Sequence, residues 1–192
     1  MGRGFVIMNE CNITQNRVKG SVSGYYISSI TSDSYITCVN VIENNQKQYN
    51  LNYHSSSSSI LKITSCNYIR NRSPTEGSLI YSSSSNVFMS YCFIHENEIP
   101  IIFYLYQSTL TFENSTTDKN TSYSSYGYPS PIFKNTGISF ENECPLLNIS
   151  TTDFVESLKY KCRDSTPNND ENEEENENNA YVQNHVKFSF YS

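Results

Sequence analysis

The stretch VFMSYCFIHEN, residues 87–97, contains the pattern that decides the fold of this chain. Apolar side chains stand at alternate positions, a cysteine follows, and the stretch ends on an asparagine three residues after a further apolar side chain. The same pattern recurs as VIMNECNITQN at residues 6–16 and as LKITSCNYIRN at residues 61–71. A motif that repeats at a fixed period of roughly 20–50 residues is typical of a solenoid, in which each repeat forms one coil.

Three weaker copies continue this register. Aligned on Asn44, the second copy spans residues 34–44, with Cys38 one position earlier than the pattern requires. A fifth copy spans residues 110–120, and a sixth spans residues 138–148, where a proline indicates that the pattern is ending. The first four cysteines are 27, 28 and 26 residues apart. The near-constant period predicts about six coils.

Apolar residues at every second position indicate short β-strands. Coils of this length with two or three short strands predict a parallel β-helix over residues 1–148. We expect it to be right-handed, because nearly all parallel β crossovers have that hand. A β-sandwich of short strands is the alternative, although a sandwich gives no reason for cysteine and asparagine to recur at a constant period.

The repeated polar and sulfur-containing residues have predicted structural roles. An asparagine at a corner of each coil tolerates left-handed backbone and can hydrogen-bond the adjacent coils, which predicts a structural ladder of Asn16, Asn44, Asn71, Asn97 and Asn120. We expect Cys11, Cys66 and Cys92 to be buried thiols inside the coils. The spacing of adjacent coils also permits a Cys66–Cys92 disulfide. The serine runs are expected on outward faces and in turns.

Residues 149–163 differ from the repeats. Within them, TTDFVESLKY at 151–160 has the spacing of a short helix, which we expect to cap the open end of the solenoid. Cys144 and Cys162 flank this segment. A disulfide between them is one interpretation, and two free thiols are the other.

The acidity of the chain is concentrated near its end. The 192 residues have a formal net charge of −6, and six of the 19 acidic residues lie in DENEEENE at 170–177. Because like charges repel and resist burial, we predict a disordered acidic spacer over 164–180, followed by a tail at 181–192. The remainder is nearly neutral, so we expect no nucleic-acid partner. No apolar run approaches the length of a transmembrane helix.

Candidate catalytic and metal-binding residues are sparse. Glycoside hydrolysis needs two carboxylates a few ångström apart, and Glu43 and Glu96 fall on similar turns two coils apart. His54, His95 and His185 share no metal-ligand spacing, and His54 and His95 are expected to be exposed polar residues. The cysteines lack the paired spacing of a zinc site. We therefore expect no catalytic residue, metal or cofactor.

Surface modification and binding are suggested by two other features. N-x-S/T sequons, which permit glycosylation in a secreted protein, occur at Asn12, Asn71, Asn114, Asn120 and Asn148. Residues 115–131 are predicted to form an insertion loop. Its tyrosines, Tyr123, Tyr126 and Tyr128, can offer stacking faces to a sugar or a protein, or simply pack within the loop.

The repeats resemble those of polymorphic outer-membrane-type proteins, which pair an F-x-x-N motif with a G-G-A-[I/L/V] motif, and those of surface protein families of parasitic protists. The first motif corresponds to Ile13-x-x-Asn16, Val41-x-x-Asn44, Tyr68-x-x-Asn71 and Ile94-x-x-Asn97, and the second, degraded, to Gly77-Ser78-Leu79-Ile80-Tyr81. This resemblance implies an extracellular or cell-surface β-helix with the pectin-lyase-like fold. It also implies a role in adhesion, display or binding, with glycans or host-cell surface proteins as partners.

We therefore expect a non-catalytic surface or secreted protein. Two alternatives stay open. Many right-handed β-helices are polysaccharide lyases or glycoside hydrolases, so a carbohydrate-active enzyme is one of them. The other is a non-functional fragment of a larger surface protein, because the chain has no signal peptide and starts within a repeat, from which we expect truncation.

Overall fold

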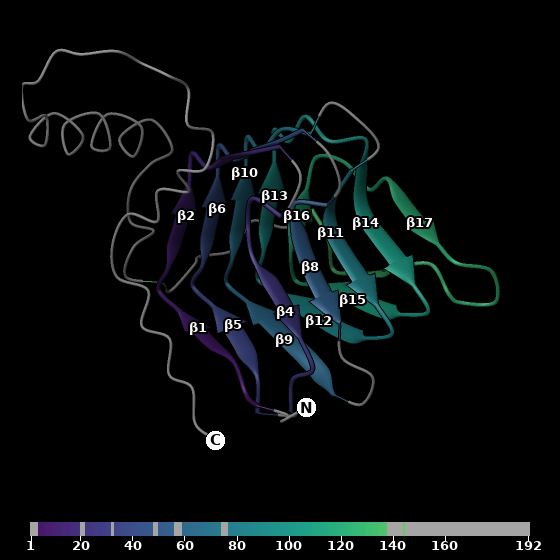
Figure 1. Ribbon diagram of the computed structural model, residues 1–192. Helices are drawn as coiled ribbons and strands as arrows, with labels where there is room; N and C mark the ends of the chain where they lie inside the picture. The colour runs from purple at the N-terminus through teal and green to yellow at the C-terminus, as the bar shows by residue number, and fades with distance from the viewer. Residues whose placement is uncertain are drawn as a thin grey trace, which may run out of the picture.

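The computed structural model describes residues 4–19, 22–31, 33–47, 50–55, 59–73, 77–137 and 144. These residues form an all-β parallel solenoid and contain no helix, as Figure 1 shows. No helix capable of spanning a membrane therefore occurs in this part of the chain. The predicted helix at 151–160, the acidic spacer at 164–180 and the tail at 181–192 lie outside the described residues.

Successive strands enter three sheets in turn. In spatial order, the first sheet contains β1 (Ile7–Asn9), β5 (Tyr35–Thr37), β9 (Ile60–Thr64), β12 (Asn86–Ser90), β15 (Thr109–Glu113) and β18 (Ile132–Lys134). The second contains β2 (Asn12–Thr14), β6 (Asn40–Ile42), β10 (Asn67–Ile69), β13 (Phe93–His95) and β16 (Thr116–Thr117). The third contains β4 (Tyr26–Ser28), β8 (Asn52–Ser55), β11 (Ser78–Ser83), β14 (Ile101–Tyr106) and β17 (Ser122–Ser124). A small fourth sheet pairs β3 (Arg17–Val18) with β7 (Asn45–Gln46).

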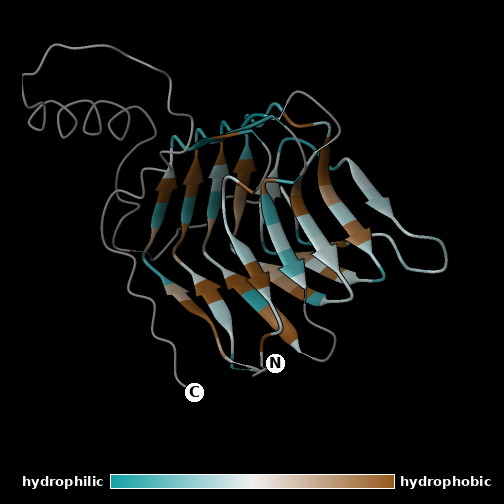
Figure 2. Ribbon diagram, viewed as in Figure 1, coloured by the Kyte–Doolittle hydropathy of each residue, from teal (hydrophilic) through white to brown (hydrophobic). Residues whose placement is uncertain are grey.

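The core lies between the sheets and is filled by columns of stacked side chains. Met8, Ile36, Ile63, Met89 and Phe112 occupy equivalent register positions in the first sheet, and none is more than 4% exposed. Bands of hydrophobic residues recur at matching positions of neighbouring strands in Figure 2. Burial of each such side chain stabilises the fold by roughly 1.5–3 kcal/mol, which explains how a chain with a mean hydropathy of −0.54 can fold.

Single residues with left-handed backbone turn the corners of the coils. Between the first and second sheets these are Glu10, Cys38, Ser65, Tyr91, Asn114 and Asn135; after the second sheet they are Gln15, Glu43, Arg70 and Glu96; and after the third sheet they are Ser29, Ser84 and Gln107. Positive φ is uncommon outside glycine, so its recurrence marks where every coil must bend. The residue before Asn16, Asn44, Asn71 and Asn97 adopts this conformation. The asparagine itself does not, contrary to our expectation.

One serine per coil points into the corner that follows the third sheet. Ser59, Ser85 and Ser108 are at most 8% exposed, and the Ser85 backbone N–H donates to Ser108 Oγ at 3.0 Å. We expected the serine runs on outward faces and in turns; these three do lie at turns, but they are buried there. A small side chain fits the tight corner, and the Ser108 hydroxyl accepts a hydrogen bond from the neighbouring coil.

The solenoid has about four turns, fewer than the six coils expected. The sixth copy, residues 138–148, lies outside the described residues except for Cys144. In the fifth copy the second-sheet strand shrinks to the two residues of β16. The predicted insertion loop at 115–131 also proves to be partly regular, because β16 and β17 continue their sheets within it. The segment after β17 extends away from the coils in Figure 1.

Candidate functional site

A column of stacked tyrosines covers the outer face of the third sheet. Tyr26, Tyr53, Tyr81, Tyr104 and Tyr123 occupy one register position on β4, β8, β11, β14 and β17. Their successive ring centroids are 4.5, 5.2, 5.1 and 4.7 Å apart. Parallel strands in register place equivalent side chains about 4.8 Å apart, which is why the rings stack. We call these five residues the tyrosine ladder.

Stacking decides which parts of the rings remain accessible. The planes of Tyr26 and Tyr53 are 3° apart, and those of Tyr53 and Tyr81 are 11° apart. Each inner ring is therefore covered on its faces and presents its edge and its hydroxyl group. The end members are more open, with Tyr26 60% and Tyr123 49% exposed. Burial, with a smaller contribution from nearby tyrosines, raises the pKa of Tyr81 above its ordinary value, so this phenol is neutral at neutral pH.

The strands that carry the ladder are free of charge. Neither acidic residues nor lysine or arginine occur in β4, β8, β11, β14 or β17. The next outward register position holds Ser28, Ser55, Ser83 and Tyr106. Tyrosine and serine dominate antibody paratopes, and charged residues are depleted at the core of interfaces. We call the outer face of the third sheet the tyrosine face. Its composition makes it the candidate binding site.

Sequence reasoning found only one end of this face. It singled out Tyr123, Tyr126 and Tyr128 as stacking residues, and Tyr123 does stack on Tyr104. Tyr126 and Tyr128 lie after β17 and are exposed, outside the ladder. A signal for the other members was present, because the ladder tyrosines are 27, 28, 23 and 19 residues apart. This spacing follows the coil length but shrinks toward the end.

The asparagine ladder forms as predicted in its inner rungs. Asn44, Asn71 and Asn97 are fully buried. Asn71 Nδ2 donates to Val41 O at 2.8 Å and to Asn97 Oδ1 at 2.9 Å. The Asn44 backbone N–H donates to Asn71 Oδ1 at 3.1 Å, and the Asn16 N–H donates to Asn44 Oδ1 at 3.0 Å. Each amide thus joins three neighbouring coils.

Asn120 does not extend this ladder, so the predicted fifth rung is wrong. The pairing of β13 with β16 ends at Ile94 and Thr117, before this position is reached, and the side chain of Asn120 is exposed. Lys119 Nζ instead donates to the Asn97 backbone oxygen at 2.6 Å. A second asparagine column, which sequence reasoning missed, runs along the start of the second sheet: Asn67 Nδ2 donates to Asn40 Oδ1, and Asn40 Nδ2 to Asn12 Oδ1, both at 2.7 Å.

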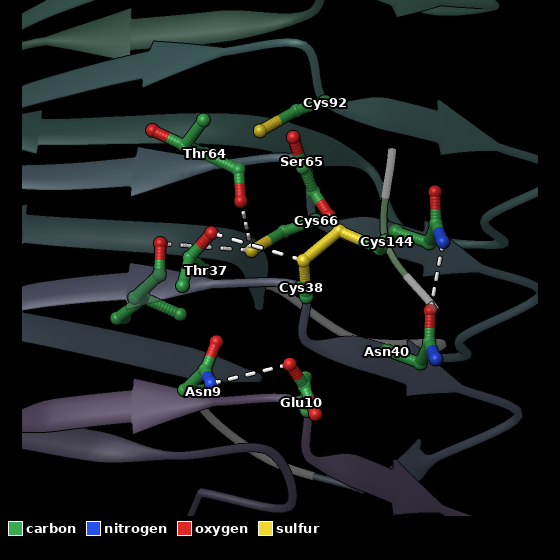
Figure 3. The surroundings of a disulfide bond; sticks show 12 residues. Asn9, Glu10, Thr37, Cys38, Asn40, Thr64, Ser65, Cys66, Cys92 and Cys144 are labelled. Carbon is green, nitrogen blue, oxygen red and sulfur yellow. Dashed lines mark hydrogen bonds between the residues drawn. A yellow bond between two sulfur atoms is a disulfide. The ribbon is translucent and has the colours of Figure 1, made fainter. Parts of the chain in front are cut away.

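The cysteines divide by the face on which they lie. Cys11, Cys66 and Cys92 are free and buried, as predicted, and Cys66 and Cys92 are not joined. Cys144 is bonded to Cys38 and not to Cys162, as Figure 3 shows. Cys38 stands one position before the inward column, at the left-handed corner between the first and second sheets. Its side chain is only half-buried there, and its sulfur is bonded to that of Cys144, 106 residues further along the chain.

The sequons differ in accessibility. Asn71 is fully buried within the asparagine ladder. Asn12 and Asn114 are half-buried, and their Oδ1 atoms accept hydrogen bonds from Asn40 and Asn135 respectively. Asn120 is exposed, and Asn148 lies outside the described residues. Burial of the acceptor is incompatible with a bulky glycan, which leaves Asn120 as the open sequon among the described residues.

The candidate carboxylates are held by an arginine. Arg70 Nε lies 3.0 Å from Glu43 Oε1, and Arg70 Nη1 lies 3.7 Å from Glu96 Oε2. The two glutamates do lie on the same corner, two coils apart, with the arginine of the intervening coil between them. These partly exposed pairs are worth roughly 0–1 kcal/mol each. Within the described ranges, no three His, Cys, Asp or Glu residues gather as a metal site.

His54 is fully buried, so the expectation that it is exposed is wrong. The register of the third sheet places it inward, beside Ile27 and Ser82. Its Nε2 lies 3.2 Å from Tyr25 Oη, which is 2.7 Å from Tyr68 Oη. Burial lowers the pKa of His54 to about 3 and raises those of both tyrosines. The cluster is therefore neutral at neutral pH.

Comparisons with protein-family models, with curated proteins and with solved structures gave no match. Fold and site together define a class: a disulfide-bonded parallel β-solenoid with an uncharged tyrosine face.

Proposed function

We propose that this chain is a non-catalytic surface or secreted β-helical protein that acts in adhesion, display or binding through its tyrosine face. The observation that carries the proposal is the uncharged ladder of five tyrosines along the third sheet. Tyrosine provides a large amphipathic contact area at low conformational-entropy cost. It is also enriched among the residues that dominate binding energy at interfaces.

An oxidising compartment is supported by the Cys38–Cys144 disulfide. Structural disulfides persist in secreted and surface-displayed proteins and are rare in reducing compartments. The resemblance of the repeats to polymorphic outer-membrane-type proteins and to protist surface families supports the same location. Glycans and host-cell surface proteins are the proposed partners.

The non-catalytic role is supported by the arrangement of the corner carboxylates. Glu43 and Glu96 are each paired with Arg70, which belongs to the intervening coil. A glycosidase needs its two carboxyl groups to flank the scissile bond. Here the arginine lies between the two glutamates, so the pair suits a structural role.

Binding of the recombinant chain to a glycan panel and to host cells tests the proposal. We expect attachment that is lost in the double variant Tyr53→Ala, Tyr104→Ala and retained in the control Tyr35→Ala, which alters an exposed tyrosine of the first sheet. Equal attachment by the ladder variant and the wild type would contradict a role for the tyrosine face. Cleavage of a polysaccharide by the purified chain would contradict the non-catalytic role.

A further inference from the structure

The tyrosine ladder has the shape of a line. Its four centroid steps of 4.5, 5.2, 5.1 and 4.7 Å extend it about 20 Å along the solenoid axis. Across the axis it is one ring wide, because the adjacent outward column is serine in three of its coils. A stable protein interface buries about 800 Å² on each partner, so a protein partner would also have to contact surface well beyond this strip. The shape suits a slender, unbranched polymer lying along the axis.

The step length and the chemistry of the ladder argue against two polymers. Side chains on one side of an extended peptide recur every 6.6–6.8 Å, roughly, which is longer than any step of the ladder. Nucleic acids need lysine or arginine for their phosphates, and the strands of this face contain neither. Their bases also need open aromatic faces, whereas each inner ring is covered by its neighbours.

We infer that the ladder binds a neutral, unbranched polysaccharide in an extended conformation, with one sugar on each tyrosine. One pyranose of an equatorially linked chain advances the polymer by a length close to the spacing of the rungs. Each sugar then places its hydroxyl groups beside one phenol hydroxyl, which both donates and accepts hydrogen bonds. This inference rests on the proposed function and names the ligand class of the same face.

The absence of charge on these strands selects against anionic sugars. Ionised carboxylates or sulfates of such polymers need arginine or lysine partners to repay their lost hydration. The phenol of Tyr81, whose pKa is raised by burial, remains a neutral hydrogen-bonding group throughout the physiological range. A chain of neutral sugars loses little hydration energy on this face because hydroxyl groups replace water on both sides.

The repeat geometry predicts a dependence on ligand length. Each added sugar gains one further rung, and a net hydrogen bond of the usual strength raises affinity about two- to tenfold. The gain stops when the ladder of five tyrosines is filled. Affinity should therefore rise up to a pentasaccharide and remain level for longer oligosaccharides.

Calorimetric titration of the full chain with oligosaccharides of increasing length tests this inference. The ligands are fragments of a neutral β-1,4-linked glucan and mannan, with oligogalacturonates as the anionic comparison. Tyr81→Phe removes one hydroxyl and keeps the stacked ring, and Tyr35→Phe is the matched control on the first sheet. We expect the plateau at five sugars for the neutral series, a several-fold loss of affinity in Tyr81→Phe, and no change in Tyr35→Phe.

Other outcomes separate this inference from the proposed function. Affinity that is independent of length, preference for the anionic series, or unchanged affinity in Tyr81→Phe would each overturn the polysaccharide assignment. If no oligosaccharide binds while ladder-dependent attachment to host cells persists, the assignment fails and the proposed function stands. If attachment to cells is also absent, both fail.

Discussion

Acidification from pH 7 to pH 5 is expected to weaken the fold through one buried histidine. His54 is fully buried, its ring is stacked on that of Tyr25 with centroids 5.4 Å apart, and its Nε2 lies 3.2 Å from Tyr25 Oη. Burial lowers its pKa from 6.5 to about 3 because the imidazolium would lose its hydration inside the solenoid. Folding therefore favours the neutral ring.

The direction and size of the effect follow from proton linkage. The unfolded chain protonates His54 as the pH falls through about 6.5, whereas the folded chain stays neutral until the pH approaches 3. Between these values the unfolded state binds more protons, so stability decreases as the pH falls. Each unit of pH well inside this window costs about 1.4 kcal/mol, and the change from pH 7 to pH 5 amounts to about 2 kcal/mol.

Urea unfolding at pH 7, 6 and 5 measures this loss. We compare the wild type with two variants. His54→Leu places an apolar side chain at the inward position of His54 on β8, and His95→Gln alters a half-buried histidine of the second sheet. His54→Leu should lose about 2 kcal/mol less than the wild type over this range. His95→Gln controls for the removal of a histidine elsewhere in the solenoid, and the carboxyl groups are common to all three proteins.

A His54→Leu variant with the same pH dependence as the wild type would refute the reasoning. The ring proton signals of His54 offer a second measurement that does not depend on a variant. In the folded protein they should not shift between pH 7 and pH 5. A shift centred near pH 6.5 would show that the ring titrates as an exposed histidine does.

Three further predictions concern stability and modification. Cys38→Ser should destabilise the chain by up to about 4.7 kcal/mol in urea unfolding, the loop-entropy value for a closed loop near 100 residues, and reducing agent should then have no further effect. Asn71→Ala should cost about 2–4 kcal/mol because buried partners lose hydrogen bonds, whereas Asn120→Ala should change stability by less than about 0.5 kcal/mol. After expression through a eukaryotic secretory pathway, peptide mass spectrometry should find glycan on Asn120 and none on Asn71, and occupancy of Asn71 in folded protein would contradict its burial.

The repeated motif was enough to predict the solenoid and much of its interior. Alternation in VFMSYCFIHEN and its copies places Val87, Met89 and Ile94 inside, and all three are buried. The asparagine ladder followed from the same register up to Asn97. These features depend on local periodicity, because a parallel solenoid places each residue on its equivalent in the next coil.

Other features depended on contacts that periodicity does not encode. His54 stands beside a serine run that hides the alternation of β8, so the burial of its ring became evident only from the register with β11. Asn120 keeps the spacing of the motif but not the burial of Asn97, since β16 ends at Thr117 and does not carry the chain into the same corner.

The candidate binding face shows the same division. Its tyrosines recur at roughly the coil period, but whether they stack on one another depends on strand register, which varies with the length of each connecting turn. The Cys38–Cys144 disulfide joins positions 106 residues apart. The pairing depends on Cys144 lying beside the corner that contains Cys38, which the sequence does not reveal.

By itself, then, the sequence determined the repeat, the strands and the inward columns, because these follow from side-chain alternation and coil length. Tertiary structure decided which tyrosines form one uncharged line, which histidine is sealed in the core and which cysteines meet. Each of these depends on the relative position of segments that are distant in the chain. Backbone hydrogen bonds between coils set that position, and no single repeat contains it.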